Sequence, residues 1–152
     1  RPPAAAAPPS GLEALPALLD AVADKDSAVR YWGAVGIGNI GKEAKSAASL
    51  MEAALKDPSS VIRIAAARAL ARLGMSKKAL PILSRELKDG EQWERLHAAI
   101  VLDEMEEKSR PALKAMHAAL EPRNDLYADG KYVVRVINRA LNQLEGTDRV
   151  VP

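Results

Sequence analysis

A repeated spacing of acidic, basic and glycine residues is the feature that most restricts how this 152-residue chain can fold. Four times an Asp is followed six residues later by an Arg, and successive Arg residues lie 33, 32 and 40 positions apart. The pairs are Asp24 and Arg30, Asp57 and Arg63, Asp89 and Arg95, and Asp129 and Arg135. Eleven residues after the Arg stand Gly41, Gly74, Glu106 and Gly146. Self-similarity at this period predicts a repeat architecture.

Each repeat predicts a pair of helices. Apolar residues at helical spacing mark a first helix in ALPALLDAV (14–22), SLMEAAL (49–55), ALPILSREL (79–87) and ALKAMHAAL (112–120). Pro16 and Pro81 lie near two of the expected starts, where a missing N–H has little effect. The second helix follows the Asp, which is expected, with the Ser residues after it, to cap the helix. Eight helices in four hairpins follow, an all-α solenoid.

The second helix of the second repeat, within DPSSVIRIAAARALARLG (57–74), has a single apolar stripe. It consists of Ile62, Ala66, Ala69, Leu70 and Leu73. Gly74 suits the left-handed residue that ends a helix. In the fourth repeat two registers are open, because RALNQL (139–144) matches RALARL (68–73) one residue out of step with the Arg135 alignment.

The segment GIGNIG (36–41) has the G-x-G-x-x-G spacing of a dinucleotide-binding loop, and Asp57 follows at a suitable distance for a ribose-binding acid. In the repeat alignment, however, this segment matches ALARLG (69–74), which has no phosphate-loop character. We therefore interpret Gly36 and Gly38 as small residues on a packed helix and Gly41 as its terminator. No cofactor is expected.

Composition and charge narrow the function classes. The chain has no Cys, so it has neither a disulfide framework nor a thiolate metal site, and no apolar stretch is long enough to span a membrane. Residues 1–76 hold nine basic against seven acidic residues, and residues 77–152 hold thirteen of each. A dedicated nucleic-acid binder shows a basic face, so this balance argues against nucleic acid as the partner.

The repeats DKDSAVRYWGAVGIGNIG (24–41) and KDPSSVIRIAAARALARLG (56–74) resemble HEAT repeats over residues 12–146. The resemblance implies repeat units at 12–41, 46–74, 78–106 and 109–146, stacked into a right-handed superhelix with the second helices on the concave side. It also implies a structural ladder between neighbouring units. The ladder residues would be Asp24, Asp57, Asp89 and Asp129 with Arg30, Arg63, Arg95 and Arg135.

Residues 28–44 and 131–147 further resemble the HEAT-type extension at the C-terminal end of some bacterial sulfatases. This resemblance implies that the Pro/Ala-rich segment 1–11 is a linker from a catalytic domain, that 147–152 is a tail, and that the location is periplasmic or extracellular. Sulfatases need a C/S-x-P-x-R motif, whereas the nearest string, SRPAL, has Leu113 at the Arg position. The chain is therefore expected to be non-catalytic, with a protein partner or the parent catalytic domain as its target.

Aromatic and basic residues near the starts of second helices are candidate partner-binding residues, since Trp, Tyr and Arg are favoured at interface hot spots. They are Tyr31, Trp32, Trp93, His97, Tyr132 and Arg139, with Arg95 and Arg135 beside them. Trp32 and Trp93 are also natural fillers of gaps between Ala-rich helices, and the sequence favours that core role.

Metal and ligand sites have weaker support. The loop EPRNDLYADGKY (121–132) offers oxygen ligands for calcium in Asn124, Asp125 and Asp129, but it lacks the EF-hand spacing. His97 and His117 stand twenty residues apart with no further ligand, so no metal site is expected. Two alternative functions stay open: ligand handling like that of phycobilin lyase-like HEAT proteins, and nucleic-acid binding by a basic solenoid.

Overall fold

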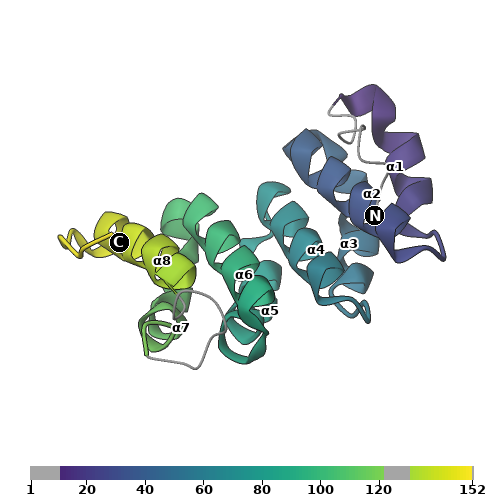
Figure 1. Cartoon of the computed structure of the whole chain (residues 1–152). Coiled ribbons are helices and arrows are strands. Elements are labelled where there is room, and N and C mark those ends of the chain that lie inside the picture. The colour runs from purple at the N-terminus through teal and green to yellow at the C-terminus, as the bar shows by residue number, and fades with distance from the viewer. Residues whose placement is uncertain (1–10, 122–130, 152) are drawn as a thin grey trace. The chain divides into compact units, whose positions relative to one another are not determined.

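The computed structural model describes residues 11–121 and 131–151, and these residues form helices with no strand. The chain divides into unit 1, Arg1–Ala79, and unit 2, Leu80–Pro152. Unit 1 contains the 3₁₀ segments η1 (Leu12–Ala14) and η2 (Gly41–Ala47) and the helices α1 (Leu15–Val22), α2 (Ser27–Ile40), α3 (Ala48–Ala54) and α4 (Ser60–Arg72) (Figure 1). Helix α5 (Ser76–Asp89) crosses the boundary. Unit 2 continues with α6 (Gln92–Glu104), η3 (Glu106–Ala112), α7 (Leu113–Ala118) and α8 (Lys131–Glu145).

The helices alternate as the repeats predict, and the fold class is the all-α solenoid. In unit 1, α1 packs on α2, α3 packs on α4, and the second helices α2 and α4 lie against each other. Their apolar stripes meet in a core of fully buried side chains that includes Leu18, Ile37, Met51, Ile62 and Leu70. Each hairpin thus buries part of its apolar surface by packing on the next, as in other repeat proteins.

The glycine-rich segment GIGNIG is helical, as the repeat alignment predicts. Gly36 and Gly38 are buried inside α2, and Gly41 follows its last residue, Ile40, with a φ of 77°. A Cβ on the neighbouring Gly33 would lie 2.9 Å from the main-chain nitrogen of Val22 in α1. The small residues therefore let α2 approach its neighbours closely, and the strand–turn–helix context of a dinucleotide loop is not present here.

The second helix of each repeat ends near a residue with positive φ, which is Gly in three repeats and Glu in the third. Gly74 has a φ of 92° and closes α4 with bonds from Gly74 N to Ala71 O (3.1 Å) and from Met75 N to Leu70 O (2.8 Å), the Schellman pattern. Gly41 and Gly146 also have positive φ. Glu106, which replaces Gly in the third repeat, keeps the left-handed conformation at a φ of 52°.

Of the two prolines predicted to lie near helix starts, one does and one does not. Pro16 lies in the first turn of α1, as predicted. Helix α5 begins at Ser76, so Pro81 lies inside the helix rather than near its start, and that prediction was wrong. Pro81 is on the exposed side of α5, where the missing N–H and the bulky ring disturb no core contact.

Burial decides between the two registers of the fourth repeat. The buried residues of α8 follow the stripe of α4 at a constant offset of 71, which is the RALNQL register: Val133, Ile137, Ala140, Leu141 and Leu144. Val134 rather than Arg135 then corresponds to Arg63. With α6 and η3, which both contact α8, these residues form the core of unit 2 around Leu102 and Met116.

Candidate functional site

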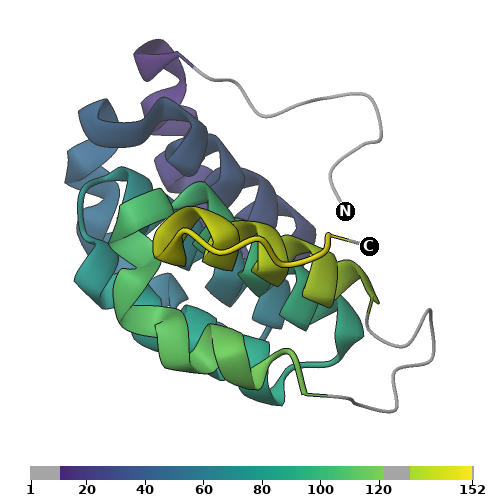
Figure 2. The same cartoon turned by 90° about the vertical axis from the view of Figure 1, so that its left-hand side faces the viewer.

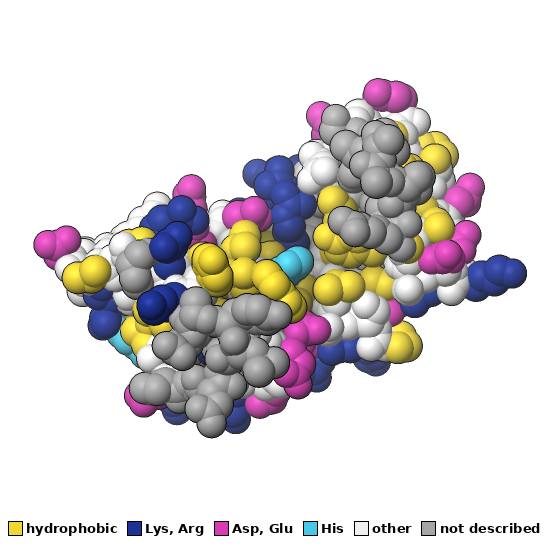
Figure 3. All heavy atoms as spheres, in the orientation of Figure 1, with side chains coloured by type: hydrophobic (Ala, Val, Ile, Leu, Met, Phe, Trp, Pro, Cys, Tyr) yellow, Lys and Arg dark blue, Asp and Glu magenta, His cyan; other side chains and the backbone are white. Residues whose placement is uncertain are grey.

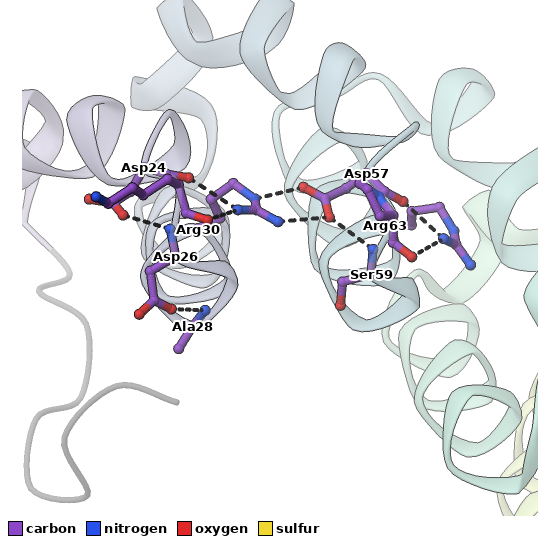
Figure 4. A network of polar contacts seen from close by, with 9 residues as sticks. Asp24, Asp26, Ala28, Arg30, Asp57, Ser59 and Arg63 are labelled. Carbon is purple, nitrogen blue, oxygen red and sulfur yellow. Dashed lines mark hydrogen bonds and ion pairs between the residues drawn. The ribbon is translucent and has the colours of Figure 1, made fainter.

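The clearest polar network in unit 1 joins the two turns that precede α2 and α4 (Figure 4). Arg30 donates from Nε to Asp57 Oδ2 at 2.8 Å and from Nη2 to Asp57 Oδ1 at 3.3 Å. Its Nη1 donates to the carbonyls of Asp24 (3.1 Å) and Lys25 (2.9 Å) in its own turn. One guanidinium thereby connects the first repeat to the second.

Asp57 is the acceptor at the centre of this network. Its Oδ1 also accepts from Ser59 N at 2.9 Å, at the start of α4. Burial raises the pKa of the Asp57 carboxyl, but the hydrogen bonds from Arg30 and Ser59 and the charges of Arg30 and Arg63 outweigh it, and the net pKa is lowered. The same hydrogen bond to Asp57 raises the pKa of Arg30.

The second turn repeats part of the first. Arg63 donates from Nη1 to the carbonyls of Asp57 (2.9 Å) and Pro58 (3.2 Å), just as Arg30 does to Asp24 and Lys25. In the first turn, Asp26 rather than Asp24 caps α2 by accepting from Ala28 N at 2.7 Å. In these two repeats, therefore, each Arg binds carbonyl groups of its own turn, and the pair of Arg30 with Asp57 joins the neighbouring repeats.

In unit 2 the corresponding residues have other surroundings. Asp89 is the last residue of α5 and is exposed, and buried Arg95 donates from Nε to Leu87 O at 3.3 Å. Arg135 is exposed, with its guanidinium 5.9 Å from the centre of the Tyr132 ring. Asp129 lies outside the described residues, as do Asn124 and Asp125 of the suggested calcium loop. A different turn sequence, DGEQ instead of DPSS, accompanies this change.

A second set of contacts between repeats was not predicted. Arg68 of α4 donates to Asn39 Oδ1 of α2 at 3.1 Å, and Arg139 of α8 donates from Nε to Asp103 Oδ2 of α6 at 3.0 Å. In the RALNQL register Arg68 and Arg139 are equivalent, so each ties a second helix to the preceding one. The matched strings RAL (68–70 and 139–141) were the available signal.

The aromatic candidates lie in two separate places. Tyr31 and Trp32 are half-buried on α2 of unit 1, whereas Trp93 and His97 lie on α6 and Tyr132 and Arg139 on α8 of unit 2. Trp93 is 60% exposed, so the expectation that it fills the core is wrong. Trp93, His97 and Ile100 share one side of α6, and Figure 3 shows hydrophobic side chains gathered on the surface over α6 and α8.

One repeat position explains the exposure of Trp93. Val61, Trp93 and Tyr132 are equivalent when α4, α6 and α8 are aligned by their buried stripes, and they are 36%, 60% and 49% exposed. The position stands one residue before the stripe that begins at Ile62 in α4, so its side chain points away from the core. We name this set, Val61, Trp93 and Tyr132, the exposed apolar position.

Unit 2 also contains a groove of about 560 Å³ between α5 and α7. Its lining includes the small residues Ala115 and Ala118 of α7 and Ala119 just after it. It also includes the basic side chains of Arg85, Lys88 and Lys114. Within the described residues no three His, Asp or Glu side chains are placed to hold a metal ion. The same residues include no helix with the length and apolar character needed to cross a membrane.

Comparison with known proteins agrees with the repeat analysis. A family model described as HEAT repeats matches residues 5–71 and, again, residues 47–127. No curated protein matches the chain. The matched residues include helices of both units, among them α2, α4 and α6.

Proposed function

The chain belongs to the HEAT-repeat family, and from this premise we propose that it is a non-catalytic scaffold that binds a protein partner. The observation that carries the proposal is the exposed apolar position. A packed helical repeat has no structural need for Trp and Tyr at a position that faces solvent, where their apolar area stays in contact with water.

The chemistry of these residues suits protein recognition. Trp93 and Tyr132 offer large, rigid apolar surfaces with polar groups at their edges, and such residues dominate binding energy at interfaces. Ile100 adds an exposed apolar side chain on α6, and Arg139 adds a cation that Asp103 holds in place. An apolar centre with a charged border is the usual composition of an interface patch.

We further propose that the partner is the catalytic domain of a bacterial sulfatase, to which this chain would serve as a C-terminal accessory region. The support is the resemblance of residues 28–44 and 131–147 to that extension. Translation of the coding DNA upstream of Arg1 tests this directly. A domain with the C/S-x-P-x-R motif would support the proposal, and an upstream sequence of another kind would contradict it.

A binding experiment tests the scaffold role. The domain found upstream is produced separately, and its affinity for the chain is measured by calorimetry. Trp93→Ala and Tyr132→Ala are each expected to weaken binding about 30-fold, as for hot-spot residues. Leu50→Ala is the matched control, because Leu50 is an exposed apolar residue on α3, the first helix of the second repeat. Equal affinities for the Trp93→Ala and Leu50→Ala chains would contradict the role of the exposed apolar position.

The non-catalytic part of the proposal has its own test. The chain contains no C/S-x-P-x-R motif, so it is expected to release no sulfate from an aryl sulfate. Sulfate release by the purified chain, retained after a second chromatographic step, would contradict it.

A further inference from the structure

The segment after α8 turns back and runs along that helix in an extended conformation (Figure 2). Two asparagines one helical turn apart hold it. Asn142 donates from Nδ2 to Arg149 O at 2.9 Å and accepts at Oδ1 from Arg149 N at 2.7 Å. Asn138 donates from Nδ2 to Val150 O at 2.8 Å. Thr147 Oγ1 adds a 2.9 Å bond to Asn142 Oδ1.

Three of these four bonds go to the main chain of the bound segment. An Asn side chain has one acceptor and one donor group in a plane, like the amide of a peptide unit, so Asn142 pairs with Arg149 as a neighbouring β-strand would. Main-chain atoms are the same for every residue except Pro. The contact therefore recognises an extended backbone and not a particular side chain.

The spacing of the two asparagines fits such a backbone. Four residues of α-helix rise about 6 Å, and two residues of extended chain span about 6.8 Å. Asn142 binds the N–H and the carbonyl of residue 149, and Asn138 binds the carbonyl of residue 150, the next peptide unit along the segment. The two asparagines thus contact successive main-chain groups of a segment that runs antiparallel to α8.

The tail of this chain fills the site incompletely. Asn138 Oδ1 is buried and has no hydrogen-bond partner among the described residues, because Nδ2 binds Val150 O and no N–H is paired with the acceptor. Arg149 Nε is likewise buried without an acceptor there. Each unpaired buried polar group costs free energy, so a segment that supplies the missing N–H and lacks the Arg side chain is expected to bind more tightly.

We propose that Asn138 and Asn142 form a binding site on α8 for an extended peptide segment of a partner protein, read through its main chain, and that residues 147–151 occupy this site in the free protein. The inference rests on the proposed scaffold function and names the kind of partner segment. The site differs from the exposed apolar position, since Tyr132 and the asparagines lie on different sides of the exposed surface of α8.

Residues 147–151, which occupy the site, regulate the access of a partner segment to it. A segment tethered a few residues from its site has a high effective concentration, so it competes strongly with an added peptide. A partner segment binds only as the tail is released, and its apparent affinity falls by the fraction of molecules in which the site is empty. Release of the tail is therefore the step that opens the surface.

A peptide titration tests the proposal on the 152-residue chain. Arg149→Pro removes the N–H that pairs with Asn142 and is expected to free the tail. A fluorescent TDRVV peptide, the sequence of residues 147–151, is titrated into this variant and followed by anisotropy. We expect saturable binding, about tenfold weaker binding to the unmodified chain because its tail competes, and about tenfold weaker binding when Asn142→Ala is added. Gln143→Ala, on the exposed surface of the same helix, is the matched control and should leave binding unchanged.

Peptide variants separate backbone recognition from side-chain recognition. TDAVV should bind at least as tightly as TDRVV, because it avoids burying Arg149 Nε. TDPVV should not bind, because Pro has no N–H. Saturable binding of TDRVV that does not depend on Asn142, or no binding to a folded Arg149→Pro chain, would overturn the proposal and identify the tail as a fixed cap.

Hydrogen exchange on the unmodified chain gives an answer even if Arg149→Pro does not fold. An exchangeable tail predicts that the Arg149 amide exchanges through local opening, faster than the amides of α8. Exchange at the rate of global unfolding would overturn the proposal. A failed peptide titration with a retained effect of Trp93→Ala on partner binding would refute this inference alone, since the scaffold function depends on the other surface.

Discussion

Replacing Glu106 by Gly is expected to stabilise unit 2. In the part of the chain that the structure describes, Glu106 is the residue other than glycine with a positive φ, 52°. The equivalent position in the first two repeats holds Gly41 and Gly74, and Gly146 follows the last residue of α8; all three have positive φ. The Ser109 hydroxyl donates to the Glu106 carbonyl at 2.7 Å, a main-chain contact that the substitution keeps.

The magnitude follows from two opposing terms. A side chain in the left-handed region destabilises the folded state by about 1–2 kcal/mol, and Gly relieves this strain. The extra freedom of Gly in the unfolded chain offsets about 0.5–1 kcal/mol of the stabilisation. Glu106→Gly should therefore stabilise by about 0.5–1 kcal/mol. Gly74→Ala is the reciprocal change: no atom lies within 4 Å of the added Cβ, so the conformation alone should cost about 1 kcal/mol.

Guanidinium denaturation followed by circular dichroism measures both effects, with Glu106→Ala as the control. That control removes the carboxylate but keeps Cβ, so it separates backbone strain from loss of the side chain. We expect the denaturation midpoint of Glu106→Gly to exceed those of the unmodified chain and of Glu106→Ala. A Glu106→Gly chain no more stable than Glu106→Ala would refute the strain argument.

Two further predictions concern unit 1. The folded pKa of Asp57 is below its ordinary value of 3.8, so its stabilising contribution is complete above the unfolded pKa and is lost as pH falls through the folded pKa. The urea midpoint of the unmodified chain should therefore decrease at pH values below about 4, and it should decrease less in Asp57→Asn. Parallel pH curves for the two chains would exclude this role. Gly33→Ala should destabilise the chain by about 1–2 kcal/mol, because the added Cβ meets the main chain of Val22. Gly38→Ala should be nearly neutral, because its added Cβ meets the flexible end of Arg68. Equal urea midpoints for the two variants would contradict this prediction.

The repeat spacing was enough to predict the alternation of helices. It placed the second helices α2 and α4, and Gly74 at the end of α4, because a 3.6-residue apolar period and a left-handed terminator are local properties of a sequence. It misplaced the start of α5, because Pro near a helix start is a preference and Pro81 is tolerated on an exposed side.

The candidate surfaces were harder to predict. Whether Trp93 is buried depends on its register relative to the stripe, and comparison with Val61, off the stripe in the second repeat, was the signal that favoured exposure. The contacts of Asn138 and Asn142 involve a turn that reverses the chain after α8, which no periodicity encodes.

The neighbour-to-neighbour packing of unit 1 has a consequence for how the chain folds. Helix α1 contacts α2, α2 contacts α4, and α3 contacts α4, so the core joins segments close in sequence. Chains dominated by such local contacts have little loop-closure entropy to overcome and fold rapidly. Translation adds about 5–20 residues per second, so the first hairpins are expected to form while the ribosome is still adding α8.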